Sequence, residues 1–468
     1  MANPIAIVLA AGKSKRMRSE TPKVLHRVAG QPMICHVLDA VRDLSPERII
    51  LIVGDQAQPI RELLGESLVY VRQEQPLGTG HAVAQVKPGD LAGGSGEVLV
   101  VYGDVPTVTS KSLQDLLAAH RRDRAAATVL TAQVPDPTGL GRILRSPSGE
   151  FVRIIEEADA SSAERTISEV NSGLYCFQAD HLLARVGELT RENAQGEYYL
   201  TDVMAILRGR GERVSLCRID DPSVVRSIND RRELAEAEQI LRRRILAHLM
   251  DQGVTIVDPA STFVDHGVQV GEDTILHPFT LLEGATRVGR ACGIGPGAHL
   301  IDTSVGHRSI IRHSVVEGTK LGDEVKVGPY AHLRPGSDLS AGVRVGNFAE
   351  IKNSTIGERS RVSHHCYVGD ATIGPDVNVG AGAVVVNYDG RQKHRTQIGS
   401  GAFVGCNANL VAPVDVAAGS YVGAGSTITR DVPAGALGVA RARQVNIEGW
   451  ATRGKLGKSA GQQGPDAP

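Results

Sequence analysis

The chain has 468 residues, too many for one ordinary hydrophobic core, so we expect two or three domains. Lys and Arg number 51 against 52 Asp and Glu, a balance that argues against a protein coating nucleic acid or binding a membrane surface. The six cysteines lack CxxC pairs, no stretch is long enough to span a membrane, and no signal peptide is visible at the N-terminus. These features predict a cytoplasmic protein with reduced thiols and no membrane span.

Short apolar runs alternate with amphipathic stretches over residues 1–228. We expect strands at Ile5–Leu9, Ile49–Val53 and Val98–Tyr102, and helices at Pro32–Leu44 and Ser112–His120. Strands alternating with helices predict an α/β domain with an open, mostly parallel, Rossmann-like sheet covered on both faces. Ligands of such sheets bind at the carboxyl ends of the strands.

A single amphipathic helix is predicted over 229–252. Asn229 or Asp230 can cap its start, and Gly253 can follow its end. One apolar stripe recurs at helical spacing, so we interpret the segment as a linker helix. The stripe consists of Leu234, Ala237, Leu241, Ile245 and Leu249.

From about residue 255 the aliphatic residues recur with a period of six. This period is typical of a parallel β-helix, in which three hexads make one coil and each aliphatic side chain points inward. We expect the β-helix to occupy 253–450, with a loop leaving it at Asn387–Gln397 and a disordered tail over 451–468. The predicted inward positions are Val270, Leu276, Leu282, Val288, Ile294, Leu300, Leu321, Val327, Leu333, Leu339, Val345, Ile351, Ile373, Val379, Val385, Ile398, Val404, Leu410, Val416, Val422 and Ile428.

The loop after the first strand, Leu9–Met17, is rich in small and basic residues. Small residues let backbone N–H groups approach phosphates, and Lys and Arg side chains then neutralise the phosphate charge. A Walker A loop is excluded because Ile7 stands where that motif needs glycine. Taken alone, the loop could equally be a basic surface loop.

Two further segments support a nucleotide site in the first domain. A second polar loop covers 73–82, and Asp104 follows the strand that ends at Tyr102. A carboxylate at the end of a strand is well placed to hold a divalent ion on phosphates. The alternative is that Asp104 only forms a turn.

The β-helix carries its own group of polar residues. Arg334 and Lys352 are three hexads apart, so they stack on one face if the period holds through both coils. His364 supplies an imidazole, and the His364-His365-Cys366 run lacks the usual spacing of metal ligands. By itself His364 is more often a surface residue, and Asn378 could belong to a hydrogen-bonded ladder.

Taken together, these motifs resemble the bifunctional N-acetylglucosamine-1-phosphate uridyltransferase / glucosamine-1-phosphate acetyltransferase family. The resemblance extends from about residue 5 to Trp450 and implies that the β-helix is left-handed. Its motifs in the first domain are Leu9–Met17, Pro22–His26, Leu77–Ala82, Tyr102–Pro106, Asp136–Gly139, Glu169–Gly173 and Asn193–Tyr199.

The resemblance also implies roles for single residues of the first domain. Arg16 and Lys23 would meet the phosphates of UTP, and Asp104 and Asn229 would bind Mg²⁺. The family usually has Gly-Thr where this chain has Ser14-Lys15, a departure that bears on the backbone of the loop. The nucleotide and sugar would contact Leu9, Ala10, Ala11, Gly12, Lys23, Gln73, Gly78, Thr79, Tyr102, Gly103, Asp104, Gly141, Glu156, Asn171 and Asn229.

In the β-helix, the resemblance implies that His364 is the general base for acylation of the sugar amine. Cys406 stands where the family usually has Ser, and a thiol is a weaker hydrogen-bond donor. Glucosamine-1-phosphate would contact Arg334, Lys352, Tyr367, Asn378 and Lys393. Acetyl-CoA would contact Ala381, Asn387, Tyr388, Cys406, Ala424 and Arg441.

The resemblance thus implies synthesis of UDP-N-acetylglucosamine, a precursor of peptidoglycan and lipopolysaccharide. Acetyl-CoA acetylates glucosamine-1-phosphate, and Mg²⁺-dependent transfer from UTP to N-acetylglucosamine-1-phosphate follows. The family is a homotrimer with acetyltransferase sites shared between subunits. One alternative is a monofunctional sugar-1-phosphate nucleotidyltransferase whose β-helix only regulates or assembles. Another is a translation-factor-like interaction protein that carries both modules without activity.

Overall fold

A computed structural model describes residues 3–12, 15–91 and 96–453 of the chain. Tertiary contacts divide the chain into two compact units. The first unit is Met1–Gln252 together with Phe263–Val268, and the second is Gly253–Thr262 together with Gln269–Pro468. The segment 263–268, which the sequence places with the β-helix, therefore packs with the first unit.

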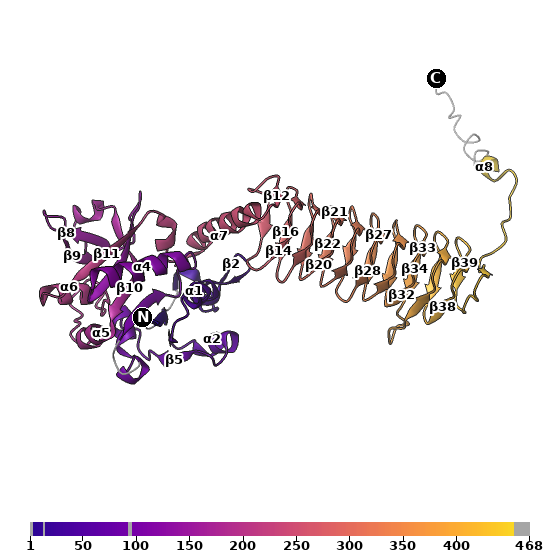
Figure 1. Ribbon diagram of the computed structural model, residues 1–468. Helices are drawn as coiled ribbons and strands as arrows, with labels where there is room; N and C mark the ends of the chain where they lie inside the picture. The colour runs from indigo at the N-terminus through magenta and orange to yellow at the C-terminus, as the bar shows by residue number, and fades with distance from the viewer. Residues whose placement is uncertain (1–2, 13–14, 92–95, 454–468) are drawn as a thin grey trace, which may run out of the picture. The chain divides into compact units, whose positions relative to one another are not determined.

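A mixed sheet forms the centre of the first unit, and its strands are ordered β11-β7-β10-β6-β1-β4-β5 (Figure 1). Strand β10 runs antiparallel to both β6 and β7, whereas β1 is parallel to β4 and β6. The sheet is mixed, as in many α/β folds, and the predicted strands are present. The strands of this path are β1 (Ile5–Ala10), β4 (Arg48–Val53), β5 (Val69–Arg72), β6 (Glu97–Tyr102), β7 (Ala127–Gln133), β10 (Glu169–Gln178) and β11 (Val214–Ile219).

Helices cover both faces of this sheet and bury an apolar core on each. Ile34 and Leu113 lie in one core, and Leu182 and Leu207 lie in the other. Two short strands, β8 (Arg142–Arg145) and β9 (Phe151–Ile155), pair antiparallel beside β10. The helices are α1 (Met33–Arg42), α2 (Ala57–Leu64), α3 (Thr79–Ala84), α4 (Ser110–Asp123), α5 (Ala179–Val186) and α6 (Asp202–Gly209).

The predicted linker helix is α7 (Arg231–Asp251). Asp230 caps its start by accepting hydrogen bonds from the N–H groups of Arg232 and Glu233, and the Glu233 side chain accepts from the Asp230 N–H. This reciprocal capping box satisfies backbone donors that a helix start otherwise leaves free. No helix among the described residues is long and apolar enough to cross a membrane.

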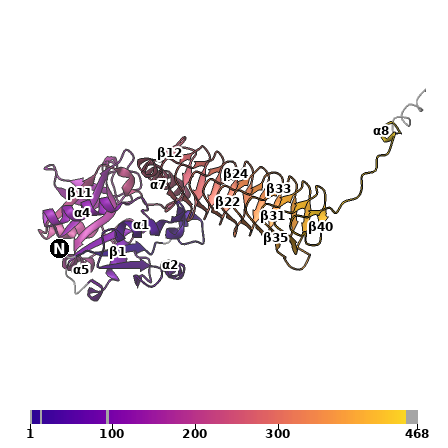
Figure 2. The same ribbon diagram turned by 45° about the vertical axis from the view of Figure 1, so that its right-hand side comes forward.

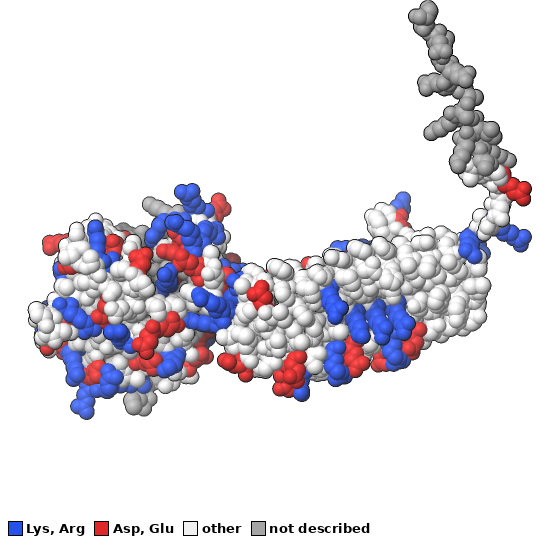
Figure 3. Space-filling model, turned by 90° about the horizontal axis from the view of Figure 1, so that it is seen from above, with Lys and Arg blue, Asp and Glu red and all other residues white. Residues whose placement is uncertain are grey.

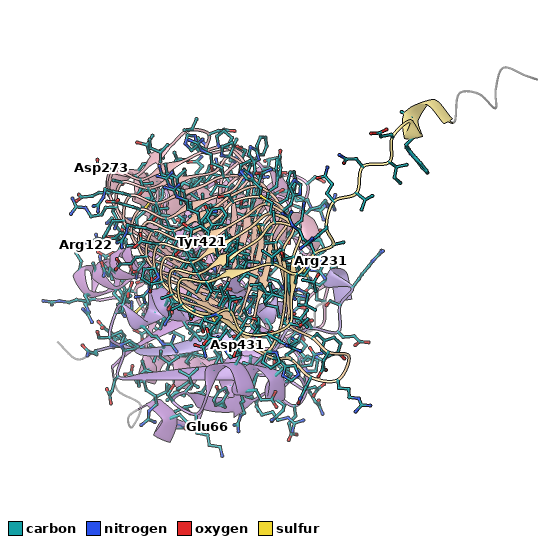
Figure 4. All side chains as sticks on the ribbon, turned by 90° about the vertical axis from the view of Figure 1, so that its right-hand side faces the viewer. Glu66, Arg122, Arg231, Asp273, Tyr421 and Asp431 are labelled. Atoms are coloured by element: carbon teal, nitrogen blue, oxygen red, sulfur yellow. The ribbon has the colours of Figure 1, made fainter. Side chains whose placement is uncertain are left out.

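The second unit is a left-handed parallel β-helix with three faces, in which each coil adds one short strand to each face (Figures 1 and 2). Figure 4 looks along the coils, which overlap one behind another, with Tyr421 labelled on one of the last. Face 1 runs from β12 (Thr255–Ile256) to β41 (Leu437–Gly438), face 2 from β16 (Leu281–Glu283) to β40 (Thr427–Ile428), and face 3 from β14 (Gln269–Val270) to β38 (Val414–Val416).

The number of residues per coil varies, so the predicted period of six does not hold along the whole β-helix. Leu321 pairs with Leu339, three full hexads along the chain. Leu339, however, pairs with Ile356, one residue short of three hexads, and Leu300 pairs with Val316, two residues short. The shorter coils have one or two corners that each lack one residue. The prediction therefore missed inward positions where the phase slips, which are Val305, Ile311, Val316, Ile356, Val362 and Val368.

The predicted loop at 387–397 does leave the β-helix, but it ends at residue 395, because Thr396 and Gln397 belong to a strand. It follows β34 (Val384–Val386), is closed by a bridge between Tyr388 and Lys393, and ends at β35 (Thr396–Ile398). Of the predicted tail, residues 451–453 belong to a short helix, α8 (Trp450–Arg453), and 454–468 lie outside the described residues.

Charged side chains of both signs are spread over the first unit, and the β-helix shows a short row of basic residues with acidic residues along one side of it (Figure 3). Face 1 contributes three basic residues in register, Lys326, Arg344 and Arg361. Like charges on neighbouring strands repel one another, so interactions among these three side chains do not stabilise the row, and the strand pairing keeps them side by side.

Candidate active sites

A cavity of about 480 Å³ opens at the carboxyl ends of β1 and β6. This is where an open α/β sheet binds ligands. The structure thereby brings together most of the predicted nucleotide-binding residues. The cavity is lined by Leu9, Ala10, Ala11, Gly12, Lys23, Val24, Gln73, Pro76, Gly78, Thr79, Ala82, Tyr102, Asp104 and Glu197.

Two glycines, one lining this cavity and one beside it, allow close backbone contacts. The Gly103 N–H donates to the carbonyl of Leu9 at 2.9 Å, and a side chain at Gly103 would meet that oxygen at 3.0 Å. Gly78 has φ +109°, and a Cβ there would lie 2.6 Å from the backbone oxygen of Tyr198. Gly78 therefore needs glycine both for its conformation and for its close backbone contact, whereas Gly103 leaves little room for a side chain beside Leu9.

The polar loop is fixed by its own hydrogen bonds. The Gln73 amide is buried and donates to the Gly78 carbonyl at 3.1 Å, and the Leu200 N–H donates to the Thr79 hydroxyl at 3.1 Å. These bonds fix Gly78, which caps the start of α3, and Thr79, the first residue of that helix.

Lys23 joins the two residues predicted to bind the metal. Its ammonium group forms an ion pair with Asp104 and donates to the side-chain oxygen of Asn229 at 3.0 Å. The other carboxylate oxygen of Asp104 is buried without a hydrogen-bond partner. The Asp104 carboxylate and the Asn229 side-chain oxygen are ligands that suit a hard divalent cation. Water and phosphate oxygens would complete the coordination of such a cation.

The resemblance assigns three residues to the N-acetylglucosamine moiety, Gly141, Glu156 and Asn171, and these also lie together. A Cβ on Gly141 would lie 3.5 Å from both Asn171 Cβ and Glu156 Oε2. Burial raises the pKa of Glu156, while a hydrogen bond from the Thr201 hydroxyl at 3.2 Å opposes that rise. The Asn171 amide donates to the Tyr175 hydroxyl at 2.8 Å, which fixes its orientation. Sequence reasoning missed Thr201, because it carries no recognisable motif.

Arg16 is the predicted phosphate ligand that the structure does not bring into the cavity. It is exposed on the short helix η1 (Lys15–Met17) and is absent from the cavity lining. Residues 13–14 and the side chain of Lys15 lie outside the described residues, so the Ser14-Lys15 departure falls there. Glu197 also lines the cavity, and the resemblance places it in the Asn193–Tyr199 motif without implying a role for it.

In the β-helix, four of the predicted glucosamine-1-phosphate ligands gather near β28 (Glu350–Lys352) and β31 (Tyr367–Gly369). Arg334 donates to Glu350 at 2.9 Å, and the strand register places it one coil from Lys352. Contact with Lys393, and then the charge of Arg334, lower the pKa of Lys352 because nearby positive charges disfavour its charged form. Such a cationic cluster is suited to bind an anion.

Asp370, which the sequence analysis did not single out, organises this cluster. Its buried carboxylate accepts hydrogen bonds from Asn353 and Asn387, each at 2.5 Å. Burial alone would raise the pKa of Asp370, but these bonds and the charges of Lys393 and Lys352 lower it on balance. Asp370 therefore anchors the start of the loop that carries Lys393. A turn-forming Asp after glycine gives no sequence signal for this role.

Gly369 is a second residue that the sequence analysis missed. A Cβ on Gly369 would lie 2.5 Å from the Tyr367 hydroxyl and 2.7 Å from the Asn387 amide nitrogen. The missing side chain therefore lets these two polar groups meet, with 3.4 Å between them. Tyr388 follows Asn387 and is exposed in the loop.

The same turn of the β-helix repeats from coil to coil, and the residues at its equivalent positions form a column, which we call the turn column. His364 and three predicted acetyl-CoA ligands occupy this column, one on each successive coil. The N–H of Gly382 donates to the His364 carbonyl at 2.9 Å, which places Ala381 one coil beyond His364. Likewise the N–H groups of the residues after Cys406 and Ala424 donate to the Ala381 and Cys406 carbonyls, each at 2.8 Å. The column is therefore His364, Ala381, Cys406 and Ala424.

The remaining two predicted ligands lie beside this turn column. Asn378 is on β33 (Asn378–Val379), three residues before Ala381. Arg441 follows Ala440, whose backbone hydrogen-bonds Ser426 and Thr427 in the coil of Ala424. Sequence-distant residues thus converge because the coils repeat the same turn.

The imidazole of His364 is exposed and oriented by one neighbour. Its Nδ1 lies 2.5 Å from the side-chain oxygen of Asn347, on the preceding coil. An amide oxygen can only accept, so Nδ1 carries the proton and Nε2 is left as the basic nitrogen. The adjacent His365 instead stacks on Phe348, with ring centroids 5.0 Å apart.

Fold and sites together define a nucleotidyltransferase unit joined to a hexapeptide-repeat β-helix with a second polar site. A MobA-like NTP transferase domain matches residues 6–182. A protein from Heliobacterium modesticaldum named "Bifunctional protein GlmU" is 50% identical over 94% of this chain and 95% of its own length. Proteins of the same name from Geobacillus sp. (98% of this chain, 100% of the relative) and Geobacillus thermodenitrificans (97% and 98%) are 46% and 48% identical. The chain belongs to the GlmU family of bifunctional proteins, which confirms the predicted pairing of acetyl and uridylyl transfer.

Proposed function

We propose that this chain makes UDP-N-acetylglucosamine in two steps at the two sites described above. The turn column and cationic cluster acetylate glucosamine-1-phosphate, and the cavity of the first unit then couples N-acetylglucosamine-1-phosphate to UTP. Membership of the GlmU family supports both activities. The observation that carries the assignment of sites is the convergence of His364 with the predicted acetyl-CoA ligands in one column.

Uridylyl transfer needs positioning and charge neutralisation more than covalent catalysis. An oxygen of the sugar phosphate attacks the α-phosphorus of UTP in line, and pyrophosphate leaves with the electrons of the broken bond. The backbone of Leu9–Gly12 and the side chain of Lys23 would hold the phosphates. Glu156 and Asn171 would hold the N-acetylglucosamine moiety and so orient the attacking phosphate.

The nucleotidyltransferase family implies a divalent metal, and the residues present fit one. Asp104 has a buried, unpartnered carboxylate oxygen, and Asn229 offers an amide oxygen beside it. We propose Mg²⁺, because carboxylate and carbonyl oxygens are its preferred ligands. When bound, it would neutralise charge on the phosphates.

Acetyl transfer needs a base, because the sugar amine must lose a proton as it is acylated. The amine nitrogen forms a bond to the thioester carbonyl carbon, and the carbon–sulfur bond then breaks. His364 Nε2 takes the amine proton, and the released CoA thiolate takes up a proton. Arg334, Lys352 and Lys393 would hold the sugar phosphate in the cationic cluster, with Tyr367 and Asn378 beside it.

The assembly and location of the protein belong to the same proposal. His364, Cys406 and Ala424 are exposed in the single chain, which leaves one side of the acetyl site open to solvent. A homotrimer with shared acetyltransferase sites would cover that side. The six cysteines are free thiols, which supports a cytoplasmic location.

The test is incubation of the purified protein with acetyl-CoA, glucosamine-1-phosphate and UTP, followed by detection of UDP-N-acetylglucosamine. Release of CoA thiol should precede release of pyrophosphate, because the acetylated sugar phosphate is the second substrate. Uridylyl transfer without any acetyl transfer would favour the monofunctional alternative. No product from either half-reaction would favour an interaction protein.

A further inference from the structure

Lys23 occupies the position where a divalent cation would contact its two protein ligands. The ammonium group is paired with Asp104 and donates to Asn229 at 3.0 Å. The side chains of Lys23 and Asp104 are only 12% and 16% exposed. A carboxylate withdrawn from water to this extent needs a compensating positive charge, and in the free protein Lys23 supplies it.

The same lysine also lines the nucleotide cavity, together with Gly12 and Gln73. Its backbone lies in the short helix η2 (Lys23–Leu25), held by a hydrogen bond from the Leu25 N–H to the Pro22 carbonyl at 2.9 Å. The backbone is therefore fixed while the four-carbon side chain can reorient. Phosphates in the cavity would offer the ammonium group a second set of anionic partners.

We propose that Lys23 is an internal counter-ion that blocks the metal site until a nucleotide arrives. In the free protein the ammonium group repels a divalent cation from Asp104 and Asn229. When UTP binds, Lys23 transfers to its phosphates, and the two oxygens become free for the cation that accompanies the nucleotide. The metal consequently binds with UTP and not before it. This inference rests on the proposed uridyltransferase function and its metal site.

The test is direct measurement of Mn²⁺ binding by electron paramagnetic resonance, without nucleotide and with UTP. Wild-type protein should bind Mn²⁺ weakly alone and much more tightly with UTP. Lys23→Met, which keeps the length of the side chain without its charge, should bind Mn²⁺ without UTP about tenfold more tightly than wild type does. Mn²⁺ should also raise the Tm of Lys23→Met more than that of wild type.

Lys111→Met is the matched control, because Lys111 also pairs with an aspartate, Asp115, at 3.0 Å in the same unit. The Lys111 side chain is 81% exposed and lies away from the nucleotide cavity, so its variant should bind Mn²⁺ as wild type does. Lys23→Gln is a second variant in case Met impairs folding, which circular dichroism reports.

Two results separate failure of this inference from failure of the proposed function. If wild type binds Mn²⁺ without UTP as tightly as Lys23→Met or Lys23→Gln, the counter-ion role is wrong. If Asp104→Asn retains UTP-dependent Mn²⁺ binding with unchanged affinity, the metal site itself is misassigned.

Discussion

At the scale of single residues, the proposed acetyl transfer depends on which nitrogen of His364 is free to accept a proton. Asn347 accepts a hydrogen bond from Nδ1, so Nε2 would be the base in the proposed mechanism. His364→Ala should lower kcat for acetylation by roughly 10²–10⁴-fold, the usual contribution of a positioned acid–base group. KM should change much less, because the cationic cluster is intact. Steady-state release of CoA thiol measures both parameters.

His365 provides the control for this substitution. It adopts a left-handed backbone conformation, with φ 49°, which asparagine tolerates. His365→Asn should therefore keep near-normal acetylation. A crippled His365 variant beside an active His364→Ala enzyme would show that the base is misassigned.

Asp370 should act on the acetyl site without contacting substrate. Asp370→Asn removes the charge that holds Asn387 and balances Lys352 and Lys393, so KM for acetyl-CoA and glucosamine-1-phosphate should rise several-fold. Because the folded-state pKa of Asp370 is lowered, its stabilising effect is present above the ordinary pKa of Asp and is lost as pH falls through the lowered value. Initial-rate measurements at neutral pH test the KM effect. Unchanged KM values for both substrates would rule out this positioning role.

At the scale of elements, the short coils should contribute to the β-helix core as fully as the coils of three complete hexads do. Strand β21 (Ile310–Ile311) offers a matched pair, because Ile311 is fully buried and Ile310 faces outward. Ile311→Ala should lower the free energy of unfolding of the β-helix by about 2–5 kcal/mol. Denaturant unfolding, followed by a probe of the β-helix, gives this value.

Ile310→Ala is the control for that measurement, since it removes the same atoms from the outer surface of the same strand. Its effect should be well below that of Ile311→Ala. Equal effects of the two substitutions would mean that this coil does not have the register described here.

The period of six predicted the β-helix because each inward aliphatic residue fills one position of a repeating prism. The prediction failed between Leu300 and Leu321 and again between Ile351 and Ile373, where corners have fewer residues and the phase slips. Loss of a corner residue leaves no local signal, so only the strand pairing reveals it. The roles of Asp370 and Thr201 were also invisible, because they arise from contacts between distant segments and not from a motif.

At the scale of the whole molecule, the two chemistries should be separable, because their residues belong to different compact units. EDTA should abolish uridylyl transfer and leave acetyl transfer unaffected, since phosphoryl transfer needs charge neutralisation by a cation and amine acylation does not. Pyrophosphate release from UTP with preformed N-acetylglucosamine-1-phosphate, and thiol release from acetyl-CoA, report the two reactions independently.

Asp104→Ala should reproduce the effect of EDTA in the presence of excess Mg²⁺. A folded Asp104→Ala protein that lost both activities would show that the sites depend on one another.

As the proposed acetyl-CoA site, the turn column would set the length of the acyl donor that fits. Neighbouring coils are spaced by about 4.8 Å, so the three steps from His364 to Ala424 span about 14 Å. On the proposed site, the acetyl group lies at the base, and an extended pantetheine arm reaches along the column toward the coil that Arg441 follows. A truncated thioester without that arm would meet the base but leave the far coils without contacts. Adding or removing one coil would therefore change the length of the acyl donor that the column can contact, while the catalytic residues stay the same.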